Sequence, residues 1–279
     1  MKLYTIETGF FKLDGGAMFG VVPKSLWQKL NPPDANNLCT WAMRCLLIED
    51  GDKAILIDNG IGDKQDPKFL AHYYLHGDGN LMKSLKTAGF SPDDITDMFL
   101  THLHFDHCGG GVRREKDSLV PTFTKATYWS TAGHWEWATK PNAREKASFL
   151  KENIQPMQES GQLRMAYAEQ KSPIAGMDIL YVSGHTEQMM LPIINYNGRT
   201  VCYMADLIPS SAHIPVPYVM GYDTRPLLTM EEKERFLTLA ADKQYILFFE
   251  HDPVIECCTV KHTEKGVRVD QTFRLSELS

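Results

Sequence analysis

The segment THLHFDHCGGG, residues 101–111, contains three histidines and one aspartate within six positions: His102, His104, Asp106 and His107. Imidazole and carboxylate groups gain little from such crowding unless a cation binds between them. The apolar run Met98–Leu100 precedes the segment and predicts a short buried strand, so the first two histidines would project to one side of an extended chain. The glycines at 109–111 would bend the chain and turn the aspartate and the last histidine toward a second point. The segment therefore predicts ligands for two metal ions about 3.5–4 Å apart, the arrangement that activates a shared water.

Four ligands cannot complete two such sites, and three later residues are candidates for the rest. Each of them follows an apolar run that predicts a strand, and these runs are Asp178–Val182, Thr200–Met204 and Tyr245–Phe249. The candidate ligands just after the runs are His185, Asp206 and His251. Imidazole and carboxylate are ligands expected for zinc, with manganese and iron as alternatives. The sequence therefore predicts two divalent metal ions.

The motif His-x-His-x-Asp-His, followed by these three residues in this order, resembles the metallo-β-lactamase superfamily from about residue 40 to 255. The resemblance implies an α+β fold, a four-layer αββα sandwich with the metals at one edge of the two sheets. It implies that His102, His104 and His185 bind one metal. It also implies that Asp106, His107 and His251 bind the other, and that Asp206 bridges the two.

Within that superfamily, the form HLHFDHxGG is most similar to acyl-homoserine lactone hydrolases and to the methyl parathion hydrolase group. The chain departs from these relatives at two places. Many members continue Gly-His-Thr-x-Gly-His, whereas Gln188 and Met189 stand at the last two positions here. The lactonases carry a tyrosine three residues after the bridging aspartate, where this chain has Pro209.

The order of predicted elements also favours α+β layering, in a single domain that spans residues 1–279. Hairpins are expected around Glu49–Asp52 and around Asn197-Gly198, the strongest short hairpin signal. Amphipathic helices are expected at Leu81–Ala88, Asn142–Ile154 and Met230–Ala241. Thr229 and Glu232 suit a capping box for the last of these. Residues 14–40 suggest a long ordered loop around a short helix.

Composition restricts the partners of the chain. The net charge is −6, basic runs are absent from the sequence, and such a chain is a poor candidate for binding nucleic acid or an anionic membrane. The N-terminal residues suggest a strand rather than a signal peptide, so the cytoplasm is the expected location. The six cysteines are expected to be mostly small buried residues rather than disulfide partners. We expect a small-molecule substrate, and formation of a homodimer is left open.

Other side chains are candidates for contact with the substrate. Met18, Phe19 and Trp27 lie in the irregular N-terminal segment and could form the wall of an apolar pocket, or simply pack under a loop. His213, Tyr218 and Tyr222 lie in the segment DLIPSSAHIPVPYVMGYD, which is expected to overhang the site and is called the Asp206 loop (residues 206–223) below. For these residues too, loop packing is the alternative.

A few polar residues near the motif have two interpretations. Asp58 follows a predicted strand and could either orient a metal-bound imidazole or cap a turn. Cys108 adjoins the motif, but a small core residue is the better interpretation because the ligand set is full. His72, His76, His134 and His262 have no companion at ligand spacing and are expected to be surface or structural histidines.

These features predict a dinuclear metal-dependent hydrolase of small-molecule esters or lactones. The nucleophile would be a hydroxide shared by the two metals, with Asp106 and Asp206 as the catalytic carboxylates. Asp106 could also donate a proton to the leaving group. One alternative is a phosphodiesterase or phosphotriesterase that uses the same metals, and another is a non-catalytic protein that retains the metal site.

Overall fold

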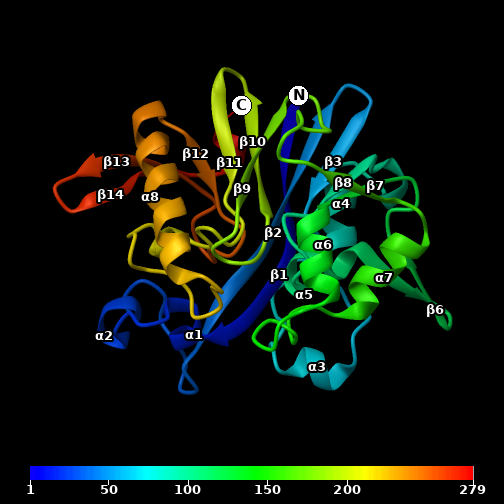
Figure 1. Ribbon diagram of the computed structural model, residues 1–279, viewed down its shortest axis with the longest axis horizontal. Helices are drawn as coiled ribbons and strands as arrows, with labels where there is room; N and C mark the ends of the chain where they lie inside the picture. Colours follow the sequence, from blue (N-terminus) through cyan, green and yellow to red (C-terminus); the bar gives the residue numbers. More distant parts are fainter. Residues whose placement is uncertain (279) are drawn as a thin grey trace. The chain divides into compact units, whose positions relative to one another are not determined.

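Two six-stranded sheets and a separate hairpin contain the strands of the computed structural model, which describes residues 1–278 (Figure 1). In order across the first sheet, the strands are β1 (Lys2–Asp14), β2 (Leu38–Asp50), β3 (Lys53–Ile57), β4 (Asp97–Phe99), β7 (Thr127–Thr131) and β8 (Leu163–Ala166). Across the second sheet they are β14 (Gly266–Phe273), β13 (Cys257–Thr263), β12 (Ile246–Phe248), β11 (Arg199–Tyr203), β10 (Met189–Tyr196) and β9 (Met177–Val182). The hairpin consists of β5 (Val112–Glu115) and β6 (Ser118–Pro121).

Eight α-helices lie between these strands in the part of the chain that the structure describes. They are α1 (Gly15–Phe19), α2 (Lys24–Trp27), α3 (Pro67–Ala71), α4 (Leu81–Thr87), α5 (Phe105–Cys108), α6 (Ala132–Thr139), α7 (Lys151–Glu159) and α8 (Pro226–Lys243). Within residues 1–278, none of the helices has both the length and the apolar character needed to cross a membrane.

Contacts between Cα atoms divide the chain into two compact units. Unit 1 contains Met1–Gly9, Met43–Pro173 and Gln188–Met190, and unit 2 contains Phe10–Ala42, Ile174–Glu187 and Leu191–Ser279. The division passes through β1, β2 and β10, so these long strands contribute residues to both units. The expectation of a single domain over residues 1–279 stays a prediction.

In unit 1, the sheet brings the region after β3 next to the region after β4. The hairpin of β2 and β3 is antiparallel and pairs Asp50 with Lys53, as expected, whereas β3, β4 and β7 are parallel. Parallel neighbours end at the same edge of a sheet. Asp58 and the segment that begins at Thr101 therefore leave the sheet side by side. Beneath them, apolar residues of α4 and α7 join the buried core of this unit.

In unit 2, the same principle places two predicted ligands at one sheet edge. The hairpin of β10 and β11 turns at Asn197 and Gly198, whose φ angles of 50° and 76° are those of a tight hairpin turn. The strands β11 and β12 are parallel, so Asp206 and His251 follow neighbouring strand ends. The long helix α8 packs against β13 and β14, the orange and red elements of Figure 1.

The helix expected over Asn142–Ile154 is wrong in its first part, because α7 begins only at Lys151. The side chain of Asn142 accepts hydrogen bonds from the backbone amides of Arg144 and Glu145 and so stabilises a turn. Glu145 in turn accepts hydrogen bonds from the side chains of Asn142 and Trp137. These polar contacts compete with a helix at this place.

The capping box expected at Thr229 and Glu232 is also wrong. Helix α8 begins earlier, with Pro226 at its first position, so Thr229 lies inside the first turn. The Glu232 carboxylate instead accepts hydrogen bonds from the backbone amides of Ser183 and Gly184, at 2.8 and 3.0 Å. Helix α6 and strands β5, β6 and β8 were not among the elements expected from the sequence.

Candidate metal centre

The four polar residues of the 102–107 motif lie together in unit 1. The Nε2 atom of His102 is 3.1 Å from Nδ1 of His104, and the rings of His102 and His107 are 3.9 Å apart between centroids. Asp106 and His107 lie in the single turn of α5, before the glycines rather than in the bend that the glycines form. Oδ2 of Asp106 is 3.8 Å from Nε2 of His107. All four side chains are almost fully buried.

Asp58 fixes the orientation of His107 and of the backbone at Thr101 through hydrogen bonds. Its carboxylate accepts hydrogen bonds from the backbone amide and the hydroxyl of Thr101, at 2.8 and 2.6 Å. It also lies 3.1 Å from Nδ1 of His107. The geometry matches the interpretation in which Asp58 orients an imidazole, with Nε2 of that ring left for a ligand. Glu145, which the sequence did not suggest, places a carboxylate oxygen 3.4 Å from Nε2 of His104.

The glycines that end the motif are required by a close approach of two backbone segments. A Cβ atom on Gly109 would lie 2.0 Å from the carbonyl oxygen of Ile61, and one on Gly110 would lie 2.3 Å from that of Asn59. The buried Lys64 also donates a hydrogen bond to the carbonyl of Gly109, and burial lowers the pKa of this lysine to about 8. The loop after β3 therefore holds the end of α5 in place.

The other three predicted ligands lie together in unit 2, around one carboxylate. Oδ2 of Asp206 is 3.0 Å from Nε2 of His185, and Oδ1 of Asp206 is 3.1 Å from Nε2 of His251. Each oxygen of this aspartate thus faces a different imidazole. Such an arrangement is suited to a carboxylate that bridges two ions.

The far nitrogens of both imidazoles are held by acceptors. Nδ1 of His185 lies 2.9 Å from the carboxylate of Asp223, and Nδ1 of His251 donates to the carbonyl of Ala42 at 2.7 Å. No local motif marks Asp223 in the sequence, because its partner His185 lies 38 positions earlier. These contacts fix the tautomer in which Nε2 is available to a metal.

The donor set fits a bound cation. With a proton on Nδ1, Nε2 of a neutral His251 carries a lone pair that faces the Asp206 carboxylate, and two acceptors at about 3 Å repel each other. A metal ion or an added proton removes this repulsion. Burial opposes the charged form of His185, but the carboxylates of Asp206 and Asp223 outweigh it and raise the pKa of His185 to about 10. The surroundings thus favour positive charge at this point.

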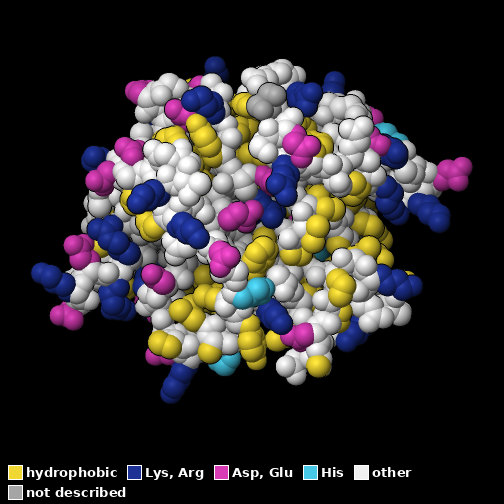
Figure 2. Space-filling model, turned by 180° about the vertical axis from the view of Figure 1, so that it is seen from behind, with side chains coloured by type: hydrophobic (Ala, Val, Ile, Leu, Met, Phe, Trp, Pro, Cys, Tyr) yellow, Lys and Arg dark blue, Asp and Glu magenta, His cyan; other side chains and the backbone are white. Residues whose placement is uncertain are grey.

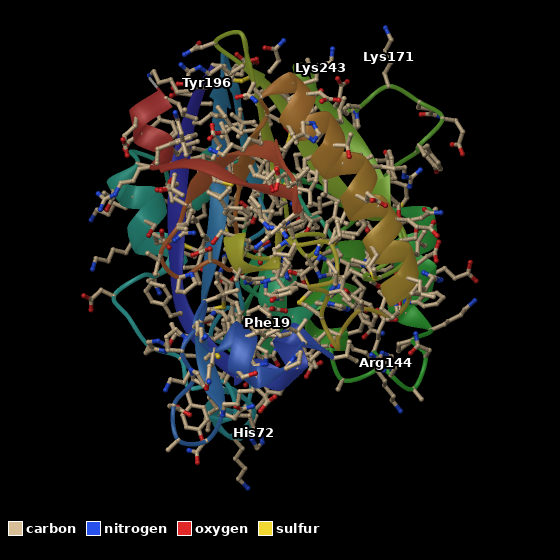
Figure 3. All side chains as sticks on the ribbon, turned by 90° about the vertical axis from the view of Figure 1, so that its left-hand side faces the viewer. Phe19, His72, Arg144, Lys171, Tyr196 and Lys243 are labelled. Atoms are coloured by element: carbon tan, nitrogen blue, oxygen red, sulfur yellow. The ribbon has the colours of Figure 1, made fainter. Side chains whose placement is uncertain are left out.

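Four of the candidates for substrate contact in unit 2 form an aromatic cluster around Phe19, which lies at the end of α1 (Figure 3); the other three members are Trp27, His213 and Tyr218. The Phe19 ring stacks on Trp27 and on His213, with centroids 5.3 and 4.5 Å apart. Tyr218 meets the same ring edge-on at 6.4 Å. Met18 is buried beside Phe19 in the sequence, and Tyr222 is 38% exposed.

His213 has protein partners for both ring nitrogens. Nδ1 lies 2.7 Å from the Ser210 hydroxyl, and Nε2 lies 2.9 Å from the carbonyl of Met18. Burial lowers the pKa of His213 to about 3, so its ring is neutral at physiological pH. These contacts favour a packing role for His213, while contact of the six candidate residues with substrate stays a prediction.

The remaining histidines and cysteines have the structural roles expected of them. Nε2 of the buried His134 accepts a hydrogen bond from the backbone amide of Leu103, and His262 pairs with Asp242 on the surface. His72 is exposed (Figure 3). All six cysteines are buried thiols outside any disulfide, and burial raises the pKa of the Cys108 thiol to about 12.

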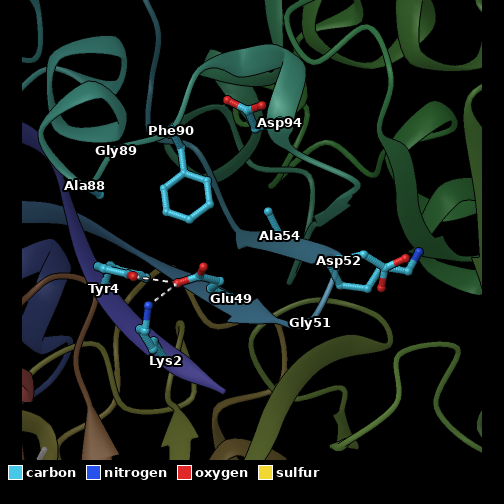
Figure 4. A pocket seen from close by; sticks show the side chains of 11 residues that line it. Lys2, Tyr4, Glu49, Gly51, Asp52, Ala54, Ala88, Gly89, Phe90 and Asp94 are labelled. Carbon is cyan, nitrogen blue, oxygen red and sulfur yellow. Dashed lines mark hydrogen bonds and ion pairs between the residues drawn. The ribbon is translucent and has the colours of Figure 1, made fainter.

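One hollow in unit 1 lies apart from the ligand clusters (Figure 4). Its volume is about 430 Å³, and Tyr4, Glu49 and Phe90 are among its lining residues. The Tyr4 hydroxyl donates to the Glu49 carboxylate at 2.6 Å, and the Lys2 ammonium lies 3.3 Å from the same carboxylate. The acidic group of this hollow is thus already bound by its neighbours.

Comparison with known proteins gives the relatives of this chain. N-acyl homoserine lactonase AiiA of Bacillus thuringiensis subsp. kurstaki is 25% identical over 264 residues, which are 90% of this chain and 93% of the relative. A probable metal-dependent hydrolase from Staphylococcus aureus has a similar structure, with a TM-score of 0.88, 28% identity, and coverage of 98% of this chain and 96% of the other. AidC, a dizinc quorum-quenching lactonase, has a TM-score of 0.78 at 24% identity and covers 97% and 94% of the two chains.

These findings confirm the predicted fold class and the predicted metal-dependent hydrolase. The family model of the metallo-beta-lactamase superfamily matches residues 44–251, a range that contains all seven predicted ligands. Because this match covers most of the sequence, the chain belongs to the metallo-beta-lactamase superfamily.

Proposed function

We propose that the chain is a dinuclear metal-dependent hydrolase of small-molecule esters or lactones. The observation that carries the proposal is the bridging geometry of Asp206, whose two oxygens each face a different imidazole. We assign His102, His104 and His185 to one metal, Asp106, His107 and His251 to the other, and Asp206 to both. Two zinc ions are the preferred occupants because His and Asp donors suit zinc, with manganese or iron as alternatives.

The protein residues around the metals have three tasks in this proposal. Two bound ions would supply Lewis acidity and a hydroxide nucleophile at neutral pH. Asp58 and Asp223 would hold His107 and His185 in the tautomer whose Nε2 carries the lone pair that a metal binds. Asp106, beside His107 in α5, would take the proton that the nucleophilic water or hydroxide gives up and pass it to the leaving-group oxygen. Burial of the ligands excludes bulk water and strengthens each of these contacts.

The choice of a neutral substrate rests on the relatives and on the surroundings of the ligands. The curated relatives are N-acyl homoserine lactonases, whose substrates contain a cyclic ester. Phe19, Trp27 and His213 are buried against one another, so the proposed contact with an apolar group of a substrate is limited to Tyr218 and Tyr222, which keep exposed area. On the face drawn in Figure 2, basic and acidic side chains are interspersed rather than gathered into a cationic field for an anionic polymer. Pro209, in place of the lactonase tyrosine, leaves the preferred ester class open to measurement.

The proposal is tested by hydrolysis assays on metal-stripped protein that is reloaded with zinc, manganese or iron. The substrates are an N-acyl homoserine lactone, a γ-lactone, p-nitrophenyl acetate and a phosphotriester. We expect turnover of a lactone or an aryl ester that disappears on chelation and returns in proportion to metal, up to two ions per chain by elemental analysis. A metal content near zero after supplementation would contradict the dinuclear site. Full metal loading without turnover of any substrate would favour the non-catalytic alternative.

Two further predictions concern the assembly and the location of the chain. A homodimer and a cytoplasmic location stay predictions, and light scattering on the metal-loaded protein measures the first of them directly.

A further inference from the structure

Lys233 is a fully buried lysine in α8 that none of the functional assignments above uses. Its ammonium group contacts three backbone carbonyl oxygens of the Asp206 loop. Nζ lies 2.7 Å from the carbonyl oxygen of Tyr218, 3.2 Å from that of Pro215 and 3.4 Å from that of Val216. The three carbonyls thus converge on a single amino group supplied by the helix, which can donate hydrogen bonds in its protonated and in its neutral form.

Burial of the Lys233 amino group costs free energy of desolvation, so the side chain does more than fill space. Burial lowers the pKa of Lys233 to about 7, against the opposite effect of the nearby Asp223 carboxylate. An apolar side chain of similar volume would avoid the cost of burying an ammonium group. It would also remove the donor that the Tyr218 carbonyl binds at 2.7 Å, whereas the Pro215 carbonyl would keep its hydrogen bond from the Tyr218 amide. An unsatisfied buried acceptor costs about 1–3 kcal/mol. The lysine therefore stabilises one particular conformation of this turn.

The turn that Lys233 binds is also packed against α1. The backbone amide of Gly221 donates to the carbonyl of Ala17 at 2.7 Å. A Cβ atom on Gly20 would lie 2.8 Å from the carbonyl oxygen of Val219, so the two backbones approach closely there. The ring of Tyr218 contacts Phe19 edge-on. A displacement of residues 215–221 would therefore displace the aromatic cluster as well.

We propose that Lys233 is a positioning residue for the substrate: its side-chain amino group fixes the turn Pro215–Tyr218 and, through it, the position of the half-buried Tyr218 against the buried Phe19. The part that concerns the substrate rests on the proposed function, whereas the part that concerns the turn does not. Lys233 itself touches neither the substrate nor the predicted metal ligands. Its loss is expected to weaken substrate binding and to leave the hydrolytic step intact.

The test compares Lys233→Met with Lys243→Met, which removes an exposed lysine from the end of the same helix (Figure 3). Hydrogen exchange is measured at the amides of Tyr218, Val219 and Gly221, which donate to the carbonyls of Pro215, Pro217 and Ala17. In Lys233→Met we expect exchange at these amides to become at least tenfold faster, while amides of β11 keep the wild-type rate. We expect KM for an N-acyl homoserine lactone to rise at least tenfold, with kcat within about threefold of the wild type and with metal content unchanged.

Other results of these measurements would overturn the proposal. Folded Lys233→Met with unchanged exchange and unchanged KM would overturn the proposal, and so would a fall in kcat accompanied by loss of metal. If Lys233→Met does not fold, Lys233→Gln is used, because its amide can still donate two hydrogen bonds; we expect it to fold and to show the same changes in weaker form. If both variants fail to fold, Lys233 is a general requirement for stability and the proposal is wrong.

Failure of the proposed function gives a different pattern. A metal-loaded wild-type protein that hydrolyses neither esters nor lactones would contradict that function and the part of this inference that concerns the substrate. The exchange measurement would still decide whether Lys233 holds the turn.

Discussion

Substitution of Asp58 by asparagine tests whether Asp58 orients His107. It changes the partner of this predicted ligand and leaves the ligand itself unchanged. Asparagine has the shape of aspartate, and its oxygen can keep the hydrogen bond from the Thr101 amide. The new NH₂ group would face the Thr101 hydroxyl, which can rotate and accept, and Nδ1 of His107, which cannot accept while it carries a proton. In Asp58→Asn, His107 therefore loses the partner that holds its ring.

The expected loss of activity or metal affinity in Asp58→Asn follows from the lost contact between Asp58 and His107. A hydrogen bond to a charged group contributes about 1.5–3 kcal/mol, and each 1.4 kcal/mol corresponds to about a tenfold change. Loss of such a partner behind a metal-bound histidine typically costs about 10- to 100-fold in metal affinity or activity. We expect Asp58→Asn to lower kcat/KM, or the affinity for metal in a chelator competition, within this range.

Asp97→Asn is the matched control. Asp97 is also buried in unit 1 and accepts from three groups, Thr96 Oγ1 at 2.7 Å, Trp129 Nε1 at 2.9 Å and Lys53 Nζ at 3.3 Å, but it contacts no predicted ligand. We expect it to lower the free energy of unfolding and to leave metal affinity within about twofold of the wild type, as for changes distant from a site. If Asp58→Asn binds metal and turns over substrate as well as Asp97→Asn does, the orienting role of Asp58 is refuted.

Three further predictions concern the bridge, the substrate and a buried lysine. Asp206→Ala is expected to abolish turnover, whereas His213→Ala should lose less because only Asp206 faces two imidazoles; equal losses at full metal occupancy would contradict the bridging role. With the same metal loaded, kcat/KM should be higher for p-nitrophenyl acetate than for bis-p-nitrophenyl phosphate, and a tenfold preference for the phosphodiester, about 1.4 kcal/mol, would favour the phosphodiesterase alternative. The pKa of Lys233 is about 7 when folded and 10.5 in the unfolded chain, so between these values the unfolded state binds more protons and stability rises with pH. In denaturant titrations, the stability of the wild type relative to Lys233→Met should therefore increase from pH 7 to pH 10, and a constant difference would show that the lysine is not perturbed.

The ligands could be predicted from the sequence because each carries a local signal. The motif at 102–107 is recognisable from its spacing alone, and Asp206 and His251 each follow a short apolar strand. The structure brings the members of each unit together as expected, because parallel strands end at a common edge. Which residues form one complete site stays part of the proposal.

The partners of the ligands could not be predicted in the same way, because their signal is not local. Asp223 is 38 positions from His185, and Glu232 is 49 positions from the amide of Ser183 that it binds. In the sequence, Glu232 has the spacing of a capping box, and Asn142 begins an amphipathic pattern. In both cases a polar side chain binds backbone amides instead. At Asn142 these hydrogen bonds outweigh the weak preference of a helical pattern, whereas Glu232 remains inside α8 and only its expected capping contact is lost.

The contact between His251 and Ala42 has a consequence for how the chain tolerates mutation. His107 and His185 are oriented by carboxylates, which a single base change can remove. His251 is oriented by a main-chain carbonyl, and its own carbonyl accepts from the amide of Ala42 at 3.1 Å. Every residue type at position 42 carries that carbonyl, so an alanine scan would not detect the contact that orients Nδ1 of His251. Sequence drift can therefore change the side chain at position 42 without releasing this imidazole, whereas the other two depend on keeping an acidic residue in place.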